Sequence, residues 1–401
     1  MRNKTPSVHP VVTRKPGPRI LLYSHDSFGL GNIRRTLLLA TELAEGHPTA
    51  AILIVTGSPV IHAFRIPERV DYIKLPSLDR VAADRYEPRF LARWADDVRE
   101  MRRSILARAV VDFSPDLFIV DKRPGGIDGE LIGPLGELRS RGSRTRVVLG
   151  IRDILDAPHR TRPAIHRAGW METIEEFYDE VWIYGSQSVF DSAREYDFSP
   201  AACERTHFTG YLAREPKPHM RSDGPPRALV STGGGGDGSP MIEAYLEGLI
   251  RLPRAIALRS TVILGPEMPS QARAAILDRF GHLSDVEFCD FDTDPMFRLA
   301  NADVVVAMAG YNTVCEILSS GPPALLVPRS KPVQEQLIRA RRLSSKGLVH
   351  MVEPDELDPV ELMDGVLSLV GERMDRTESI DLGGVDVVRS RARTLLAEAS
   401  A

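Results

Sequence analysis

The chain has 401 residues, of which 43% are hydrophobic, and its formal net charge at pH 7 is −4. This length predicts two domains with sizeable cores rather than one. The small negative charge excludes a global positive field that would draw the protein to nucleic acid or to an anionic membrane. The three cysteines are far apart and form no Cys-x-x-Cys pair, which argues against a zinc site and favours a reducing compartment.

The start of the chain is basic and rich in proline, and it lacks the apolar stretch of a signal peptide. We therefore expect a flexible arm over 1–18. No apolar run approaches the ~20 residues that a membrane span needs. We expect a cytoplasmic protein with at most a peripheral contact at the inner membrane face. The arginine-rich run over 139–146 is a candidate for that contact, and a solvated helix end is the alternative.

Short β-branched runs alternate with longer helical patterns along the rest of the chain. The runs are RILLYS, AILIVT, DLFIVD, RVVLGI and EVWIYG in the first half, and RALVST, STVILG, DVVVA and PALLVP in the second. This alternation predicts an α/β protein with two parallel sheets built from βαβ units. From the Pro- and Gly-rich stretch between the halves, we expect a first domain over 19–210, a linker over 211–226, a second domain over 227–385 and a final helix over 386–401.

The first predicted strand runs into the turn SHDSFGLGN, Ser24 to Asn32, and then into a helix. Gly29 and Gly31 permit close backbone approach, and the first N–H groups of a helix are free to donate, so the turn is suited to an anion. Ligands of open parallel sheets bind beyond the carboxyl ends of the strands. Two such domains would therefore place their loops across a cleft.

The stretch RALVSTGGGGDGSP, Arg227 to Pro240, repeats this arrangement in the second half. Gly233, Gly234 and Gly235 precede a helix that begins near Ser239. Their backbone amides, together with the helix dipole, favour a diphosphate. The alternative is a flexible glycine loop without a ligand.

A third block, from Asp303 to Leu343, combines a strand, an Ala-Gly turn and a helix that carries Glu316. Glu316 lies one helical turn after Asn312, close enough to a phosphate-bearing loop to accept hydrogen bonds from two ribose hydroxyls. The alternative is a solvated carboxylate that stabilises the helix dipole. Gln334 and Gln336 open the next helix and could bind sugar hydroxyls, unless they are ordinary surface glutamines.

This third block resembles the donor-nucleotide region of the GT-B glycosyltransferases, in particular the family of the UDP-N-acetylglucosamine transferase of lipid II synthesis and the galactolipid synthases. The motifs that carry the resemblance are AG, TVCE, GPP, ALLVP and QEQ, with STGGGGDG, FTGYLARE and FGLGN in the remainder. The chain as a whole also resembles a group of bacterial predicted glycosyltransferases. The resemblance implies a GT-B fold, in which two Rossmann-like domains face each other across a cleft.

The resemblance also implies roles for individual residues. The family normally inverts the anomeric centre, uses no essential metal, and would recognise the base with backbone near Phe288 to Phe291. The implied assignments are Gly233, Gly234 and Gly235 beside the donor diphosphate, Gly310, Asn312 and Thr313 on its other side, Glu316 on the ribose, and Gln334 and Gln336 on the sugar. Gly29, Gly31 and Asn32 would form the acceptor loop.

The stretch DFDTDP, Asp290 to Pro295, contains the Asp-x-Asp spelling by which another glycosyltransferase fold holds a divalent metal. Here Asp294 followed by Pro295 is better explained as a helix N-cap with proline at the first helical position. We therefore predict no metal site.

An inverting displacement needs a base to deprotonate the acceptor hydroxyl. Family members often have histidine where this chain has Asn32, and an amide cannot act as that base. His25 and Asp26 at the end of the first strand are our preferred candidates, against a structural histidine and an Asx-turn residue. Asp153 follows another strand on the same rim and comes next.

These observations predict an inverting, metal-independent hexosyl or N-acetylhexosaminyl transferase. It would move a sugar from a nucleotide diphosphate-sugar, with UDP the favoured nucleotide, to a small or lipid-linked acceptor. The nucleotide-sugar is a co-substrate, and no cofactor is expected. Two alternatives stay open: a UDP-sugar 2-epimerase, and a catalytically silent nucleotide-binding partner protein, which Asn32 favours.

Overall fold

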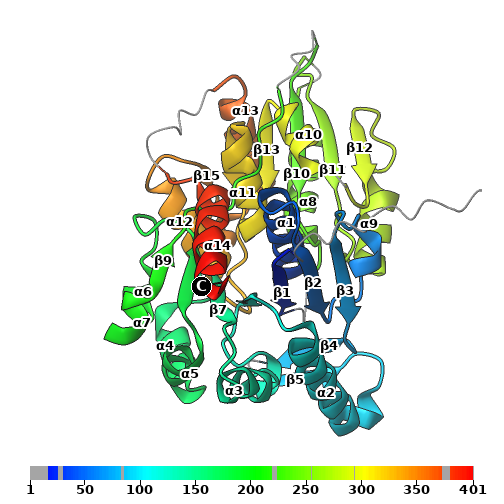
Figure 1. Ribbon diagram of the computed structural model, residues 1–401. Coiled ribbons are helices and arrows are strands. Elements are labelled where there is room, and N and C mark those ends of the chain that lie inside the picture. The colour runs from blue at the N-terminus through cyan, green and yellow to red at the C-terminus, as the bar shows by residue number, and fades with distance from the viewer. Residues whose placement is uncertain are drawn as a thin grey trace, which may run out of the picture.

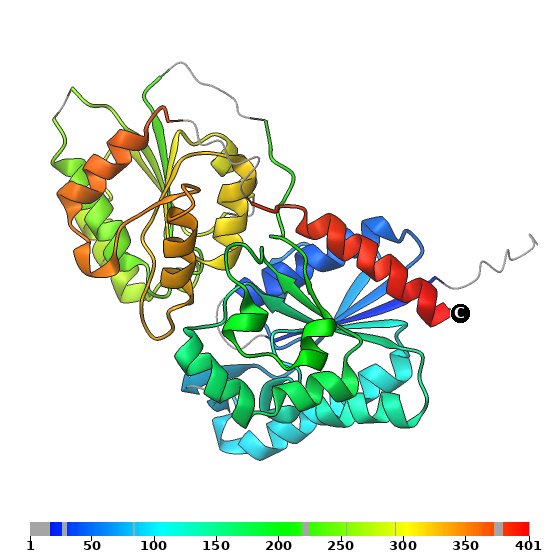
Figure 2. The same ribbon diagram turned by 90° about the vertical axis from the view of Figure 1, so that its left-hand side faces the viewer.

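The computed structural model describes residues 17–25, 30–82, 85–218, 224–253, 255–292, 294–372 and 380–400. It contains two α/β domains, each with a central parallel sheet covered by helices on both faces (Figures 1 and 2). The predicted fold class is confirmed. The apolar runs form buried strands because both faces of a parallel sheet are covered.

The N-terminal domain contains a seven-stranded parallel sheet in the order β3-β2-β1-β6-β7-β8-β9. Its strands are β1 (Arg19–Ser24), β2 (Ala51–Thr56), β3 (Val70–Lys74), β6 (Leu117–Asp121), β7 (Arg146–Arg152), β8 (Glu180–Tyr184) and β9 (Thr206–Phe208). A separate antiparallel hairpin is formed by β4 (Leu78–Ala82) and β5 (Arg85–Pro88). The carboxyl ends of β1, β6 and β7 lie side by side, because β6 pairs with both of its neighbours.

Helices cover both faces of this sheet. They are α1 (Gly31–Gly46), α2 (Ala95–Phe113), α3 (Ile132–Ser140), α4 (Pro158–Arg167), α5 (Trp170–Phe177), α6 (Ser192–Glu195) and α7 (Pro200–Glu204), with short 3₁₀ turns η1 (Ile61–Ala63), η2 (Ala92–Trp94) and η3 (Ile127–Gly129).

The C-terminal domain contains a six-stranded parallel sheet in the order β12-β11-β10-β13-β14-β15. Its strands are β10 (Arg227–Ser231), β11 (Arg259–Ile263), β12 (Val286–Cys289), β13 (Val304–Ala307), β14 (Ala324–Leu326) and β15 (His350–Met351). Its helices are α8 (Ser239–Ile250), α9 (Ser270–Phe280), α10 (Pro295–Ala300), α11 (Tyr311–Ser320), α12 (Glu335–Ser344) and α13 (Pro359–Leu369), with η4 (Pro354–Glu356).

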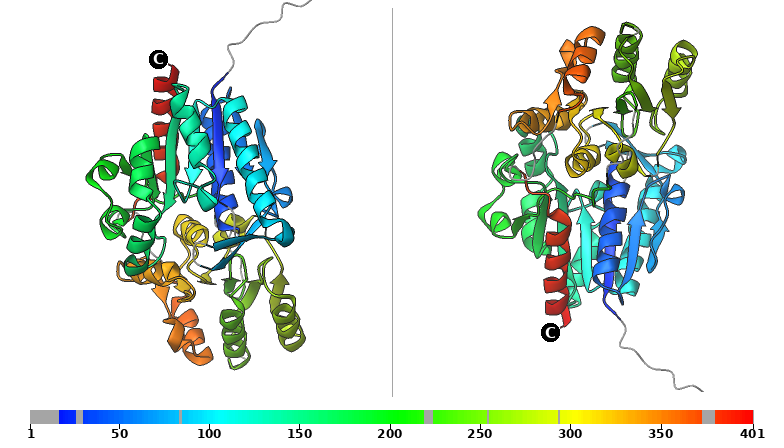
Figure 3. Two further views of the ribbon diagram at one scale, coloured as in Figure 1. Left: turned by 90° about the horizontal axis from the view of Figure 1, so that it is seen from below. Right: turned by 90° about the horizontal axis from the view of Figure 1, so that it is seen from above.

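The chain crosses between the domains twice, and the two crossings touch. Leu212 and Gly383 form an antiparallel bridge, and the Tyr211 amide donates to the Asp381 carbonyl oxygen at 2.8 Å. The last helix, α14 (Gly384–Ser400), then returns to the N-terminal domain and lies along α1 (Figure 3). Its buried side chains join the core cluster that also contains Leu39 and Leu43 of α1.

An ion pair fixes α14 to the sheet. The Arg391 guanidinium donates to both carboxylate oxygens of Glu180 on β8, at 2.5 and 2.6 Å. Among the described residues, no helix is both long and apolar enough to cross a bilayer.

Candidate functional site

The glycine loop after β10 has a backbone that only glycine adopts easily. Gly235 has φ +92°, and a Cβ there would lie 2.4 Å from the Leu264 carbonyl oxygen. The Glu267 amide donates to the Gly234 carbonyl oxygen at 2.8 Å, which holds the loop against the segment that follows β11. The glycines at these positions therefore permit close packing of one loop on another, as well as approach by a ligand.

The start of α11 lies beside this loop. A Cβ at Gly233 would lie 3.5 Å from the Thr313 hydroxyl oxygen, and one at Gly310 would lie 3.8 Å from the same atom. Gly310 is the N-cap of α11, and no side chain caps that helix end. Three of the residues that the resemblance places around a diphosphate are thus brought together beside a helix N-terminus with free N–H donors, where an anion is favoured.

Glu316 is buried in the second turn of α11 and faces the other domain. Its carboxylate accepts from Arg34 of α1 at 2.5 Å and lies 3.8 Å from the Arg214 guanidinium. Asn312 makes a second cross-domain contact, donating from its side-chain amide to the Gly31 carbonyl oxygen at 3.0 Å. In this conformation Glu316 binds a cation of the N-terminal domain at the place where a ribose was predicted.

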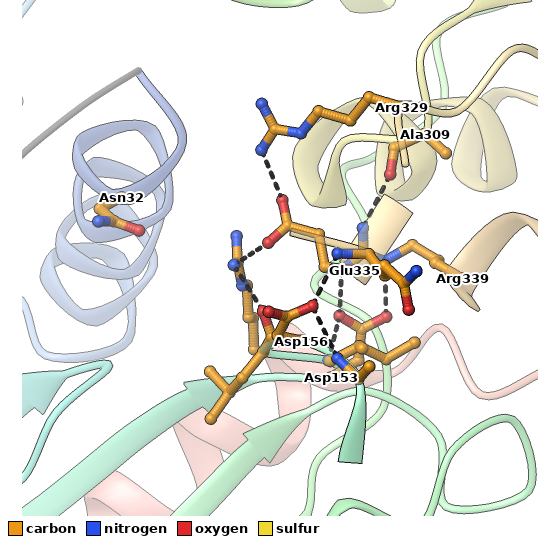
Figure 4. Close-up of polar contacts among 12 residues, drawn as sticks. Asn32, Asp153, Asp156, Ala309, Arg329, Glu335 and Arg339 are labelled. Carbon is orange, nitrogen blue, oxygen red and sulfur yellow. Dashed lines mark hydrogen bonds and ion pairs between the residues drawn. The ribbon is translucent and has the colours of Figure 1, made fainter. Parts of the chain in front are cut away.

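Glu335, between the two glutamines predicted to contact the sugar, is the centre of another cross-domain cluster (Figure 4). Its carboxylate accepts from Arg152 at the end of β7 and, at 3.1 Å, from Arg329. Burial alone would raise the pKa of Glu335, but Arg152 and Arg329 lower it below its ordinary value. Glu335 was not predicted as a functional residue, although it stands between Gln334 and Gln336 in the sequence.

The two predicted glutamines occupy different environments. The Gln334 backbone amide donates to Asp156 Oδ1 at 2.7 Å, across the domain interface. Gln336 is buried, and its side-chain oxygen accepts from the Arg329 amide at 3.4 Å.

Asp153, the third candidate base, is buried in a bidentate ion pair with Arg339 of α12 (Figure 4). The Arg339 Nε and Nη2 atoms donate to the two carboxylate oxygens at 2.8 and 2.7 Å, and Arg339 Nη1 donates to the Ala309 carbonyl oxygen. The Tyr211 hydroxyl donates to the same carboxylate at 3.1 Å. Asp153 is thus 1% exposed and pairs with Arg339 across the domain interface, while its role as a base stays a prediction.

His25 is completely buried, with its Nε2 atom 3.3 Å from the Tyr86 hydroxyl. Burial and the nearby cations lower the pKa of His25 well below its ordinary value, so the imidazole is neutral at pH 7. The Asn32 amide donates to the His25 carbonyl oxygen, and Arg35 donates to the Asn32 side-chain oxygen at 3.1 Å. Asn32 therefore fixes the end of β1 to the first turn of α1. Asp26 and Gly29 lie outside the described residues.

The Asp-x-Asp stretch forms a helix cap. Asp294 accepts from the Phe297 amide at the start of α10 and pairs with Lys217, while Asp292 accepts from Arg298 at 3.0 Å. In the described part of the chain, no group of three or more histidine, cysteine or acidic side chains is arranged to hold a metal ion.

A cavity of about 920 Å³ lies at the hinge between the domains. It is lined by the outer face of α1, the segment 213–216 and the loop before α10. Phe64 and Phe291 meet edge to face on its wall, with ring centroids 6.4 Å apart. Arg34 also lines it, so the cavity is adjacent to the Glu316 ion pair.

Comparison with known proteins agrees with this architecture. Residues 231–382 match the model of the glycosyltransferase family 28 C-terminal domain. A UDP-N-acetylglucosamine--N-acetylmuramyl-(pentapeptide) pyrophosphoryl-undecaprenol N-acetylglucosamine transferase of Methylobacterium nodulans is 31% identical over 160 residues, or 40% of this chain and 43% of that protein. The match thus spans less than half the length of this curated relative.

Two solved structures have the same fold over almost the whole chain. The glycotransferase of kitacinnamycin has a TM-score of 0.60 at 17% identity, covering 96% of both chains. MurG of Acinetobacter baumannii has a TM-score of 0.53 at 16% identity, covering 94% of this chain and 95% of that one. At these identities the likeness establishes the fold, which is GT-B.

Proposed function

The chain carries a glycosyltransferase family 28 C-terminal domain within a GT-B fold, and from this we propose that the protein is an inverting glycosyltransferase. It takes a hexosyl or N-acetylhexosaminyl group from a nucleotide diphosphate-sugar, with UDP as the favoured nucleotide, and needs no metal. The acceptor is a small or lipid-linked molecule bound by the N-terminal domain.

The observation that carries this proposal is the meeting of Gly233, Gly310 and Thr313 at the uncapped start of α11. This arrangement offers backbone N–H groups and a hydroxyl to the diphosphate that leaves as the sugar is transferred. Donors fixed before reaction stabilise developing negative charge without reorganisation, which is the largest single contribution in many enzymes. Such donors let the reaction proceed without a metal.

Glu316 is proposed to bind the ribose hydroxyls after exchanging its partner. In this structure its carboxylate is held by Arg34. A nucleotide that binds Glu316 therefore displaces a cation of the opposite domain, so donor binding alters the domain interface at this point. Gln334 and Gln336 are proposed to contact the donor sugar, on either side of Glu335, which pairs with Arg152 and Arg329.

The base is proposed to be Asp26 or His25. Both directly follow β1 in the sequence, and His25 lies at the carboxyl end of that strand, where ligands of parallel sheets bind. His25 has one imidazole nitrogen, Nδ1, without a hydrogen-bond partner. In-line attack by the deprotonated acceptor hydroxyl then inverts the anomeric centre as the nucleoside diphosphate leaves.

The proposal is tested by calorimetric titration of the protein with UDP, GDP, dTDP and their sugar conjugates, with donor hydrolysis followed in the same samples. Selective binding of one nucleotide with slow sugar release supports a transferase and identifies the donor. Binding without turnover toward any acceptor favours the silent partner protein instead. Absence of binding to all of them refutes the proposal.

A further inference from the structure

A group of basic side chains lies at the carboxyl ends of β1, β6 and β7 in the N-terminal domain. It consists of His25, Lys122 and Arg152, here called the basic cluster. His25 follows β1, Lys122 follows β6, and Arg152 ends β7. The pairing of β6 with both β1 and β7 places the three residues side by side.

Lys122 has an unusual backbone conformation. Its φ is +73°, in the left-handed region that non-glycine residues rarely adopt, and its amide donates to the Gly150 carbonyl oxygen at 2.7 Å. Strained residues of this kind collect at functional sites, where the surrounding structure maintains them. The hydrogen bond to Gly150 of β7 holds Lys122 at the rim of the sheet.

The carboxylates around the cluster each have a cationic partner, although Asp121 engages its partner through Oδ1 alone and its Oδ2 is buried without a hydrogen bond. Asp121 pairs with Arg35, Glu130 pairs with Arg102, and Asp153 pairs with Arg339. Glu335 from the C-terminal domain pairs with Arg152 and Arg329. Within the described part of the chain, the Lys122 ammonium group has no hydrogen-bond or ion-pair partner.

The remaining charged groups near Lys122 are mostly positive. Burial is the leading cause that lowers the pKa of Lys122 to about 7. The positive charges of Arg152, Arg123 and Arg80 lower this pKa further, whereas the negative charge of Asp121 raises it. Arg123 itself lies over the Tyr86 ring, 5.9 Å from its centroid. The nearby imidazole of His25 is neutral, so it adds a hydrogen-bonding group and no charge.

Two buried nitrogens of the cluster lack partners. His25 Nδ1 and Arg152 Nε are both buried and have no hydrogen-bond partner. Buried polar atoms in folded proteins are nearly always hydrogen-bonded, so each exception calls for an explanation. A ligand that accepts hydrogen bonds would supply the missing partner of Arg152 Nε, and that of His25 Nδ1 in the tautomer that carries the proton on Nδ1.

We propose that the basic cluster binds an anionic group of the acceptor, either a phosphate ester or a carboxylate. This proposal rests on the proposed function, because it assigns the acceptor to the N-terminal domain and the donor to the loops after β10 and β13. Arg152 pairs with Glu335 of α12, so the cluster lies at the boundary between the domains, where donor and acceptor meet. The acceptor class is therefore a negatively charged molecule that carries a hydroxyl group.

Protonation and binding should be coupled. Burial, and after it the neighbouring arginines, favour neutral Lys122, whereas a bound anion favours the ammonium form. Binding above pH 7 should therefore take up a proton from solution. Sulfate is a suitable probe because it stays a dianion over this range, so any proton uptake comes from the protein.

Sulfate is titrated calorimetrically into the full-length protein, which is first saturated with UDP so that the glycine loop is occupied. The titration is done at pH 8 in two buffers of different ionisation enthalpy, because the difference between the two heats gives the number of protons taken up. Lys122→Met keeps an unbranched side chain and a similar backbone preference, and Lys346→Met in the exposed turn after α12 is the matched control. We expect Lys122→Met to weaken sulfate binding at least tenfold and to abolish proton uptake. Lys346→Met should change neither by more than twofold. Thermal unfolding of each variant checks that it is folded.

A second arm identifies the source of the anion. Turnover of the donor is compared with glucose, glucose 6-phosphate and glucuronate as acceptors, and a preference for either charged sugar that Lys122→Met removes supports the proposal. If UDP binds but sulfate binds equally to the wild type and Lys122→Met, the basic cluster is not an anion site and this inference fails. If none of UDP, GDP, dTDP and their sugar conjugates binds, the proposed function fails, while the sulfate comparison still decides whether the cluster binds anions.

Discussion

Replacing Asp153 with asparagine should destabilise the protein more than any surface charge substitution. Asp153 is 1% exposed and Arg339 is fully buried, and the pair is joined by two hydrogen bonds of 2.7 and 2.8 Å. Asp153→Asn leaves the Arg339 charge buried beside a neutral amide, which can accept only one of the two hydrogen bonds, and the Ala309 carbonyl oxygen. Removing one member of a buried pair typically costs about 3–5 kcal/mol, and we expect a loss in that range.

The matched control is Glu353→Gln. Glu353 forms an equally short pair with Arg341, with an Nε–Oε1 distance of 2.7 Å, but both side chains are on the surface, where such pairs contribute about 0–1 kcal/mol. Urea unfolding followed by circular dichroism reports both domains, whereas tryptophan fluorescence reports the N-terminal domain, which holds Trp94, Trp170 and Trp182. In Asp153→Asn the two signals should separate, because the domains lose a shared ion pair. Coincident transitions with a loss no larger than that of the control would refute the reasoning.

Three further outcomes are expected. Glu316→Gln should weaken nucleotide binding by about 1.5–3 kcal/mol in calorimetry, the scale of hydrogen bonds to a charged group, and unchanged affinity would remove Glu316 from the site. Gly235→Ala should destabilise the protein by about 1–3 kcal/mol and reduce nucleotide binding, because Gly235 has φ +92° and a Cβ there would meet the Leu264 carbonyl oxygen. The control is Gly136→Ala on α3, where a Cβ meets nothing within 4 Å, and this change should be neutral or stabilising. Burial holds the pKa of His25 below its ordinary 6.5, so the unfolded chain binds more protons and stability falls as the pH drops below that value. His25→Gln should flatten this dependence by up to about 1.4 kcal/mol per pH unit, measured by urea unfolding between pH 6.5 and 5.

The features that depend on local sequence were predictable. Each apolar run became a strand, and the glycines at 233 and 235 have positive φ, as a tight strand-to-helix turn requires. The Asp294 cap with proline after it also formed as expected, because a cap depends only on residues within one helical turn.

The charge pairing was not predictable in the same way. Arg34 and Glu316 are 282 residues apart, and Asp153 and Arg339 are 186 apart, so neither partner is visible from the other's local sequence. Sequence reasoning placed Asp153 correctly at the rim after β7, but could not show that an arginine of the second domain already occupies its carboxylate. The left-handed backbone of Lys122 has no local sequence signal either, because neither glycine nor asparagine stands there.

The return of α14 to the N-terminal domain has a consequence for how the protein is made. Because α14 contributes buried side chains to the core beside α1, that domain is assembled from two ends of the chain, with the C-terminal domain inserted between them. Segments that leave the ribosome first fold first, at a synthesis rate of roughly 5–20 residues per second. The inserted domain can thus fold during translation as one continuous segment, while the N-terminal domain waits for the helix that closes its core.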